Sequence, residues 1–136
     1  MKKLACLLIL CSLNINSQTL KSLQAEADAY QKCLDKGENM KGCAEDYYTL
    51  ADHHLNTVYK KLMAKLTGAE KLQLKEEQRK WLKKRDNEFK KIHREANEVF
   101  DCGYMCQDYL MTVANNEAGF VLERVKVLIK RLEKLK

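Results

Sequence analysis

The chain has 136 residues, a length that indicates one domain, and its 25 basic and 19 acidic side chains give a net charge of +6. It contains no proline and only five glycines, so the composition favours helices. The charge excess is modest and, together with the export signal at the start of the chain, argues against a nucleic-acid partner. An acidic partner, anionic lipid or a cell-wall polymer stays open.

The first residues have the pattern of an export signal. Residues 1–3 are a short basic segment, residues 4–13 are almost wholly apolar, and residues 14–18 are mostly small and polar. The apolar run is too short to span a bilayer. We expect cleavage after Ser17, which leaves a mature domain of residues 18–136 in the periplasm or outside the cell. A buried helix at the start of a cytosolic protein is the alternative.

The cysteines fit an exported chain. Four of the six lie beyond the expected cleavage site: Cys33, Cys43, Cys102 and Cys106. An even number indicates two disulfides, and we favour pairing the cysteines that are close in sequence, with Gly103 relieving the strain of the second spacing. Long-range pairings remain an alternative, while the spacings fit common zinc motifs poorly. In the signal, Cys11 follows Leu10 rather than a small residue, so a lipoprotein anchor at Cys11 is disfavoured.

Apolar periodicity predicts four helices, at about residues 20–36, 44–66, 69–100 and 107–135. The first should end at Gly37, because glycine adopts a positive φ without strain. Thr67 and Glu70 have the spacing of a capping box, so the third helix should begin directly after the second and run antiparallel to it. We therefore expect an all-α fold: a small antiparallel bundle of about four helices, stapled by disulfides, in which the first bridge pins the first two helices together.

Two polar groups interrupt the apolar stripes of the second and third helices. They are Asp52, Asn56 and Tyr59 on the second helix, and Gln78, Trp81 and Arg85 on the third. The tight turn lets these two faces meet, and a buried charge requires a partner. The simplest network pairs Arg85 with Asp52, adds Asn56 and Gln78 through hydrogen bonds, and packs Trp81 beside them. We favour a structural role that fixes the helix register over a role in lining a partner-binding groove.

No catalytic, cofactor or metal site is predicted. The three histidines are His53, His54 and His93, and neighbouring residues such as the first two do not share a helix face. The sequence lacks the zinc-protease, phosphate-loop and Ser-His-Asp motifs. The acidic residues around 76–77 and 86–88 lie among lysines, as on a solvated helix surface. We therefore expect a binding protein without enzyme activity and without a cofactor.

The interrupted stripes carry a family resemblance. The patterns A-D-x-x-L-N-x-x-Y-x-x-L at residues 51–62 and Q-R-x-W-L-x-x-R-D at residues 78–86 together resemble the LprI-like lysozyme-inhibitor family of exported bacterial proteins. The resemblance extends from Cys33 to about Asp86. Phe89 stands where the family often has a cysteine, so the resemblance does not imply the second disulfide. It implies a binding or inhibitor module that acts by protein–protein contact, with lysozyme as the candidate partner.

The charge of the chain bears on that partner. Common secreted lysozymes are basic, and like charges slow encounter unless a local patch is acidic; Glu38, Glu45 and Asp46 would supply one. The alternative function is a cell-envelope structural or interaction protein that contacts anionic lipid or cell-wall polymer through basic helix faces. Residues 121–136 form one such basic amphipathic segment, although we favour its packing into the bundle. The sequence leaves the oligomeric state open.

Overall fold

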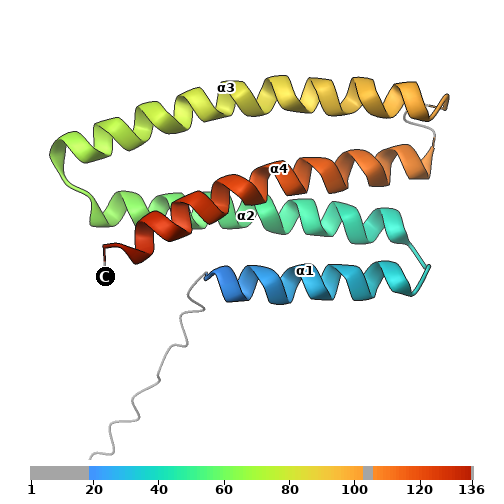
Figure 1. Ribbon diagram of the computed structural model, residues 1–136, viewed down its shortest axis with the longest axis horizontal. Helices are drawn as coiled ribbons and strands as arrows, with labels where there is room; N and C mark the ends of the chain where they lie inside the picture. Colours follow the sequence, from blue (N-terminus) through green and yellow to red (C-terminus); the bar gives the residue numbers. More distant parts are fainter. Residues whose placement is uncertain (1–18, 103–105, 136) are drawn as a thin grey trace, which may run out of the picture.

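A computed structural model describes residues 19–102 and 106–135, and within these ranges the protein is a bundle of four α-helices (Figure 1). The helices are α1 (Leu20–Asp35), α2 (Met40–Lys65), α3 (Gly68–Val99) and α4 (Gln107–Glu133). The predicted all-α bundle of four helices is therefore confirmed. The expected export signal at residues 1–17 lies outside the described residues. None of the helices in the described ranges is long and apolar enough to cross a membrane.

Local signals determine where the helices begin and end. Gly37 follows α1 with a φ of 68°, as predicted for the residue that ends this helix. The backbone N–H of Thr67 donates to the carboxylate of Glu70 at 3.4 Å, so the predicted capping box forms at the start of α3. The second helix begins at Met40, four residues earlier than predicted, because Asn39 adopts a left-handed conformation and its side chain accepts a hydrogen bond from the next turn.

Consecutive helices run antiparallel, whereas α2 and α4 run in the same direction (Figure 1). The most extensive helix–helix contact is between α2 and α4, and α4 lies between α2 and α3 in Figure 1. Ala44, Ala51 and Ala118 are fully buried or nearly so, and these small side chains allow the two helices to approach closely. The α2–α4 pair is therefore the centre of the bundle, and the tight α2–α3 turn does not make those two helices the closest neighbours.

The apolar core has two parts. The larger part surrounds the α2–α4 contact and includes the fully buried Val58, Leu62 and Val125. The smaller part lies where α3 ends and α4 begins, around Ile92 and the fully buried Tyr109. Because α3 contributes fewer buried residues than α4, most of its surface faces solvent and is available for charged side chains.

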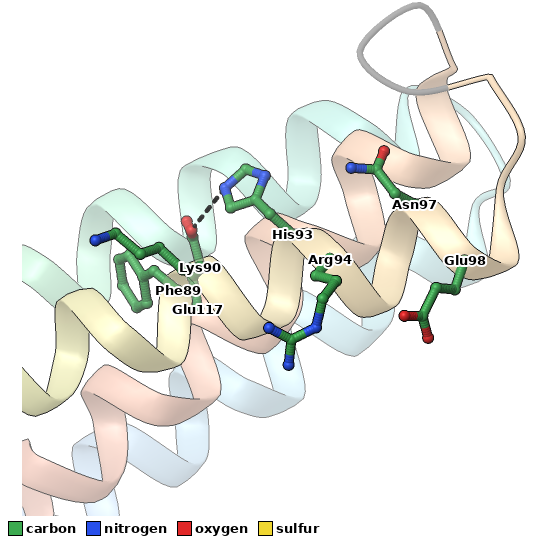
Figure 2. Close-up of a pocket in the computed structure, with 7 residues that line it drawn as sticks. All are labelled: Phe89, Lys90, His93, Arg94, Asn97, Glu98 and Glu117. Carbon is green, nitrogen blue, oxygen red and sulfur yellow. Dashed lines mark ion pairs between the residues drawn. The ribbon is translucent and has the colours of Figure 1, made fainter.

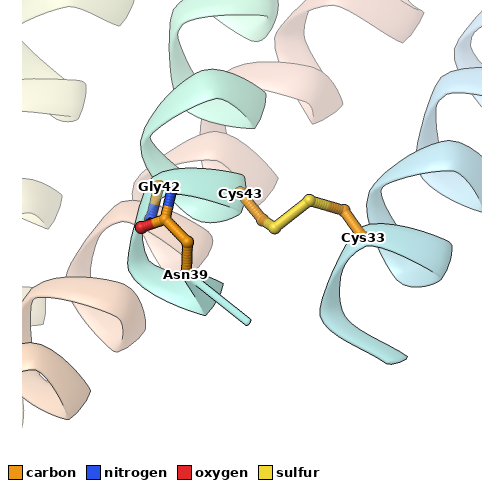
Figure 3. The surroundings of a disulfide bond; sticks show 4 residues. All are labelled: Cys33, Asn39, Gly42 and Cys43. Atoms are coloured by element: carbon orange, nitrogen blue, oxygen red, sulfur yellow. A yellow bond between two sulfur atoms is a disulfide. The ribbon is translucent and has the colours of Figure 1, made fainter. Parts of the chain in front are cut away.

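The structure pairs all four cysteines of the expected mature chain as predicted. Cys33 at the end of α1 bonds to Cys43 at the start of α2, with their Cα atoms 6.0 Å apart (Figure 3). Cys102 bonds to Cys106 between α3 and α4. Figure 3 also shows the Asn39 side chain over Gly42. The Asn39 side-chain oxygen accepts a hydrogen bond from the Gly42 backbone N–H at 3.3 Å. The first disulfide thus closes the α1–α2 turn beside a capped helix start.

Candidate functional site

Five of the six residues from the interrupted stripes line one hollow between α2 and α3. They are Asp52, Asn56, Tyr59, Gln78 and Arg85. We call this hollow the motif groove; its volume is about 300 Å³, and Leu55 and Leu82 also line it. Lys75 and Arg79 lie at its α3 side. The groove therefore combines an apolar lining with three cations and the single carboxylate of Asp52.

Three polar side chains of the motif groove bond within their own helices: Asp52, Asn56 and Arg85. The Asn56 amide donates to the Asp52 carboxylate at 3.0 Å and to the Asp52 carbonyl at 2.9 Å. The Arg85 guanidinium donates twice to Asp86, from Nη2 at 2.7 Å and from Nε at 3.1 Å. The predicted pairing of Arg85 with Asp52 is therefore wrong. The neighbouring Asp86 takes both donors, and the close packing of α4 against α2 leaves α3 without extensive contact with α2.

Gln78 and Trp81 find their partners on α4. The Gln78 side-chain oxygen accepts a hydrogen bond from Nε of Arg124 at 3.1 Å. The Trp81 ring stacks on Phe120, with centroids 5.8 Å apart and an interplanar angle of 16°. Burial lowers the pKa of Arg124, while the nearby Glu77 acts in the opposite direction. These contacts anchor α3 to α4. The sequence signal for them was Arg124, a charged residue directly before Val125 of the apolar stripe of α4.

Arg85 is held over aromatic rings but remains accessible. Its guanidinium lies 5.7 Å from the ring centre of Phe89 and 6.0 Å from that of Trp81. Its side chain is 26% exposed, and that of Asp86 is 58% exposed. Such cation–ring contacts orient a guanidinium without occupying all five of its donors. Arg85 therefore lines the motif groove with a guanidinium that is oriented by the rings and partly exposed.

A second polar cluster, which sequence reasoning missed, joins α3 to α4. Nε2 of His93 lies 3.2 Å from the Glu117 carboxylate (Figure 2), and Nδ1 lies 2.7 Å from the hydroxyl of the buried Tyr109. Burial raises the pKa of Glu117, although His93 and Arg85 act in the opposite direction. The signal was present in the sequence, because Glu117 interrupts the apolar stripe of α4. The described ranges hold no group of three or more potential ligands that could bind a metal ion.

His53 and His54 point to different environments. His54 is 5% exposed, and its Nε2 lies 2.7 Å from the Glu26 carboxylate on α1. His53 is exposed, with its Nε2 3.5 Å from the Thr57 hydroxyl. The Glu26–His54 contact crosses from α1 to α2 and, with the first disulfide, fixes these two helices relative to each other.

The comparison with known families decides the assignment. The sequence model of the family described as "Lysozyme inhibitor LprI" matches residues 31–128, which is more than half of the chain. This chain belongs to the LprI lysozyme-inhibitor family. The match continues beyond Asp86, where the motif resemblance ends, through most of α4, so the LprI range includes the partners that α4 supplies to α3. No curated protein and no solved structure matches the chain.

Proposed function

We propose that this LprI-family protein is an exported inhibitor that acts by surface contact with a lysozyme. The family match over residues 31–128 carries the proposal. Export is supported by the signal pattern of residues 1–17 and by the two disulfides, which persist in oxidising compartments. Inhibition by contact requires no catalytic group; it requires a surface that covers the entrance to the partner's substrate cleft.

We propose that the motif groove is part of that surface. Asp52 and Asn56 bond to each other on α2, and Arg85 bonds to its neighbour on α3, so none of the three holds α2 to α3. These contacts within single helices favour an interface role for the three residues over the role in fixing the helix register that the sequence favoured. Partly exposed polar side chains beside Tyr59 and two leucines give the mixture of directed hydrogen bonds and apolar area that protein interfaces use.

The size of the molecule is sufficient for this role. A standard interface buries about 800 Å² on each partner, which is a small part of the 10050 Å² surface of this chain. The 32 residues of α3 extend for roughly 48 Å at about 1.5 Å per residue. One long side of the bundle can therefore span the mouth of an enzyme cleft without any change of fold.

The test is inhibition of several lysozyme types on cell-wall substrate by the oxidised mature chain. We expect saturable inhibition near stoichiometric amounts for at least one type. Arg85→Met should then weaken inhibition by about tenfold or more, the equivalent of roughly 1.4 kcal/mol for an interface anchor. Lys83→Met is the matched control, because Lys83 is exposed on α3 but does not line the motif groove. If no lysozyme type is inhibited, the partner assignment is wrong.

A second function is favoured by the basic side chains of α3. Six of them are exposed between residues 71 and 84: Lys71, Lys75, Arg79, Lys80, Lys83 and Lys84. A surface of this kind attracts anionic lipid or cell-wall polymer. Salt separates the two functions, because binding to a polymer or lipid should collapse as ionic strength rises, while a packed protein interface should weaken less. Vesicle and cell-wall sedimentation at low and high salt makes this comparison.

A further inference from the structure

The charge of the chain is divided unevenly along the sequence. Residues 26–52 carry seven acidic and three basic side chains, a net charge of −4, whereas residues 53–136 carry 12 acidic and 19 basic side chains, a net charge of +7. The acidic range comprises most of α1 and the first half of α2. Figure 1 places α1 on the opposite side of the α2–α4 pair from α3. A protein with a net positive charge therefore has an acidic segment on its α1 side, although Asp52 of this range lines the motif groove and Lys126 and Lys130 of α4 lie beside the start of α1.

A small hollow lies on the α1 side, between α1 and α2 and beside the first disulfide. Its volume is about 230 Å³, and Ala29, Leu50 and the disulfide itself form part of its lining. The rings of Tyr30 and Tyr47 also line it and are stacked, with centroids 4.2 Å apart and an interplanar angle of 9°. The Tyr30 hydroxyl donates to Asn115 on α4 at 3.0 Å, which helps to fix the Tyr30 ring. The hollow is thus a preformed, largely apolar and aromatic surface.

The only acidic or basic side chains that line this hollow are two carboxylates, Glu26 and Asp46. Glu26 is positioned by its contact with His54 at 2.7 Å. Asp46 is exposed, and its carboxylate makes no hydrogen bond or ion pair with another side chain of the described ranges. No basic side chain lines the hollow to neutralise it. An occupant with a positive charge is therefore favoured over a neutral or acidic one.

We propose that this hollow receives an arginine side chain of a basic protein partner. The flat guanidinium stacks on aromatic faces and bonds to a carboxylate through two parallel donors, whereas an ammonium group is a compact point charge. The apolar stem of arginine would cover Ala29 and Leu50 while its head bonds to Asp46. The disulfide and the Glu26–His54 contact hold the two walls at a fixed separation, which lowers the cost of binding.

This docking site is distinct from the motif groove, which lies on the α3 side of α2, and it rests on the proposed function only for the identity of the partner. For a basic lysozyme, it provides the acidic surface that the net charge of the chain conceals. The alternative occupants are a lysine side chain and the basic side of a second copy of this protein.

The test uses a small probe, so that it does not depend on lysozyme. The oxidised mature chain, labelled for NMR, is titrated with N-acetyl-arginine amide and, as a neutral isostere, with N-acetyl-citrulline amide. We expect arginine-dependent shifts that cluster at Tyr30, Tyr47 and Leu50. Asp46→Asn should weaken them about two- to fivefold, the range for one exposed ion pair. The control is Asp28→Asn, because Asp28 is exposed on α1, bonds to Gln24 and does not line the hollow.

Several outcomes would overturn the inference. Equal shifts with citrulline, tighter binding of a lysine probe, or shifts scattered over all exposed carboxylates would each remove arginine selectivity at this site. Shifts at Tyr30 and Tyr47 that depend on protein concentration without any probe would identify a second copy as the occupant. A failure here leaves lysozyme inhibition through the motif groove intact, and an absence of lysozyme inhibition leaves this titration fully interpretable.

Discussion

Replacing Arg85 with methionine measures how much the fold depends on the motif groove. The change removes the ion pair with Asp86, and exposed pairs of this kind contribute about 0–1 kcal/mol. It also removes contacts with the rings of Phe89 and Trp81, each about 0.5–1 kcal/mol at partly exposed sites. Methionine restores part of this loss, because its sulfur packs well against aromatic edges. We therefore expect the free energy of unfolding to fall by about 1 kcal/mol.

The competing arrangement gives a clearly different number. If Arg85 were paired with Asp52 across the two helices and buried, removal of one partner would cost about 3–5 kcal/mol. A double-mutant cycle with Asp52→Asn and Arg85→Met isolates the interaction between the two side chains. We expect a coupling energy below about 0.5 kcal/mol, as for residues that share no direct contact.

The assay is urea unfolding of the oxidised mature chain, followed by far-UV circular dichroism, with the denaturant dependence of each variant compared before the midpoints. Arg79→Met is the control, since Arg79 bonds to Glu76 at 2.7 Å with both side chains about 60% exposed, and it should change stability very little. A loss of about 3 kcal/mol or more for Arg85→Met, or a coupling above about 1.5 kcal/mol, would refute the reasoning. Arg85 would then brace α2 against α3, and the motif groove would be a structural joint.

Three further predictions concern stability and pH. Gly119→Ala should stabilise the protein by about 0.5–1 kcal/mol in urea unfolding, because Gly119 is helical and no atom lies within 4 Å of an added Cβ; a loss of stability would contradict this. Replacing Cys33 and Cys43 together with serine should cost about 2.5–3 kcal/mol for a bridge of sequence separation 10, and unchanged stability would contradict the constraint. Burial raises the pKa of Tyr30 and of Tyr47 above the model-compound value of 10.0, so both should ionise later than free tyrosine in an absorbance titration. Because the folded state then holds these protons more tightly than the unfolded chain does, stability should fall as pH rises above 10; titration together with free tyrosine would contradict this.

The helices were predictable because their determinants are local. Apolar spacing reports which face is buried, and the glycine at residue 37 and the Thr67–Glu70 pair end and begin helices through contacts within a few residues. The exception is equally local: α2 starts early because Asn39 adopts a positive φ, which asparagine tolerates and which apolar periodicity does not report. The disulfides followed from short sequence separations, since closing a short loop costs little chain entropy.

The partners of the polar residues were not predictable, because they depend on the order of the helices in space. A polar residue in an apolar stripe indicates that a partner exists, but not the helix that supplies it. Gln78 bonds to Arg124 and Glu117 contacts His93, and both contacts cross from α3 to α4. The tight turn between α2 and α3 suggested that those two helices would share their polar side chains. The small residues of the α2–α4 contact brought α4 close to α2 instead.

The net charge of the chain is a poor guide to its partner for a related reason. Charges in physiological salt act over about 8 Å, a distance comparable to the spacing of two packed helices. The helix α3, which carries many of the cations, lies on the far side of the α2–α4 pair from α1 (Figure 1), so salt weakens the effect of its charges at α1. A basic partner that approaches α1 therefore meets the acidic range of residues 26–52 rather than the average of the whole chain. The objection that two basic proteins repel each other applies to the α3 side and is weaker at the α1 side, where the hollow beside the disulfide is lined by two carboxylates and no basic side chain.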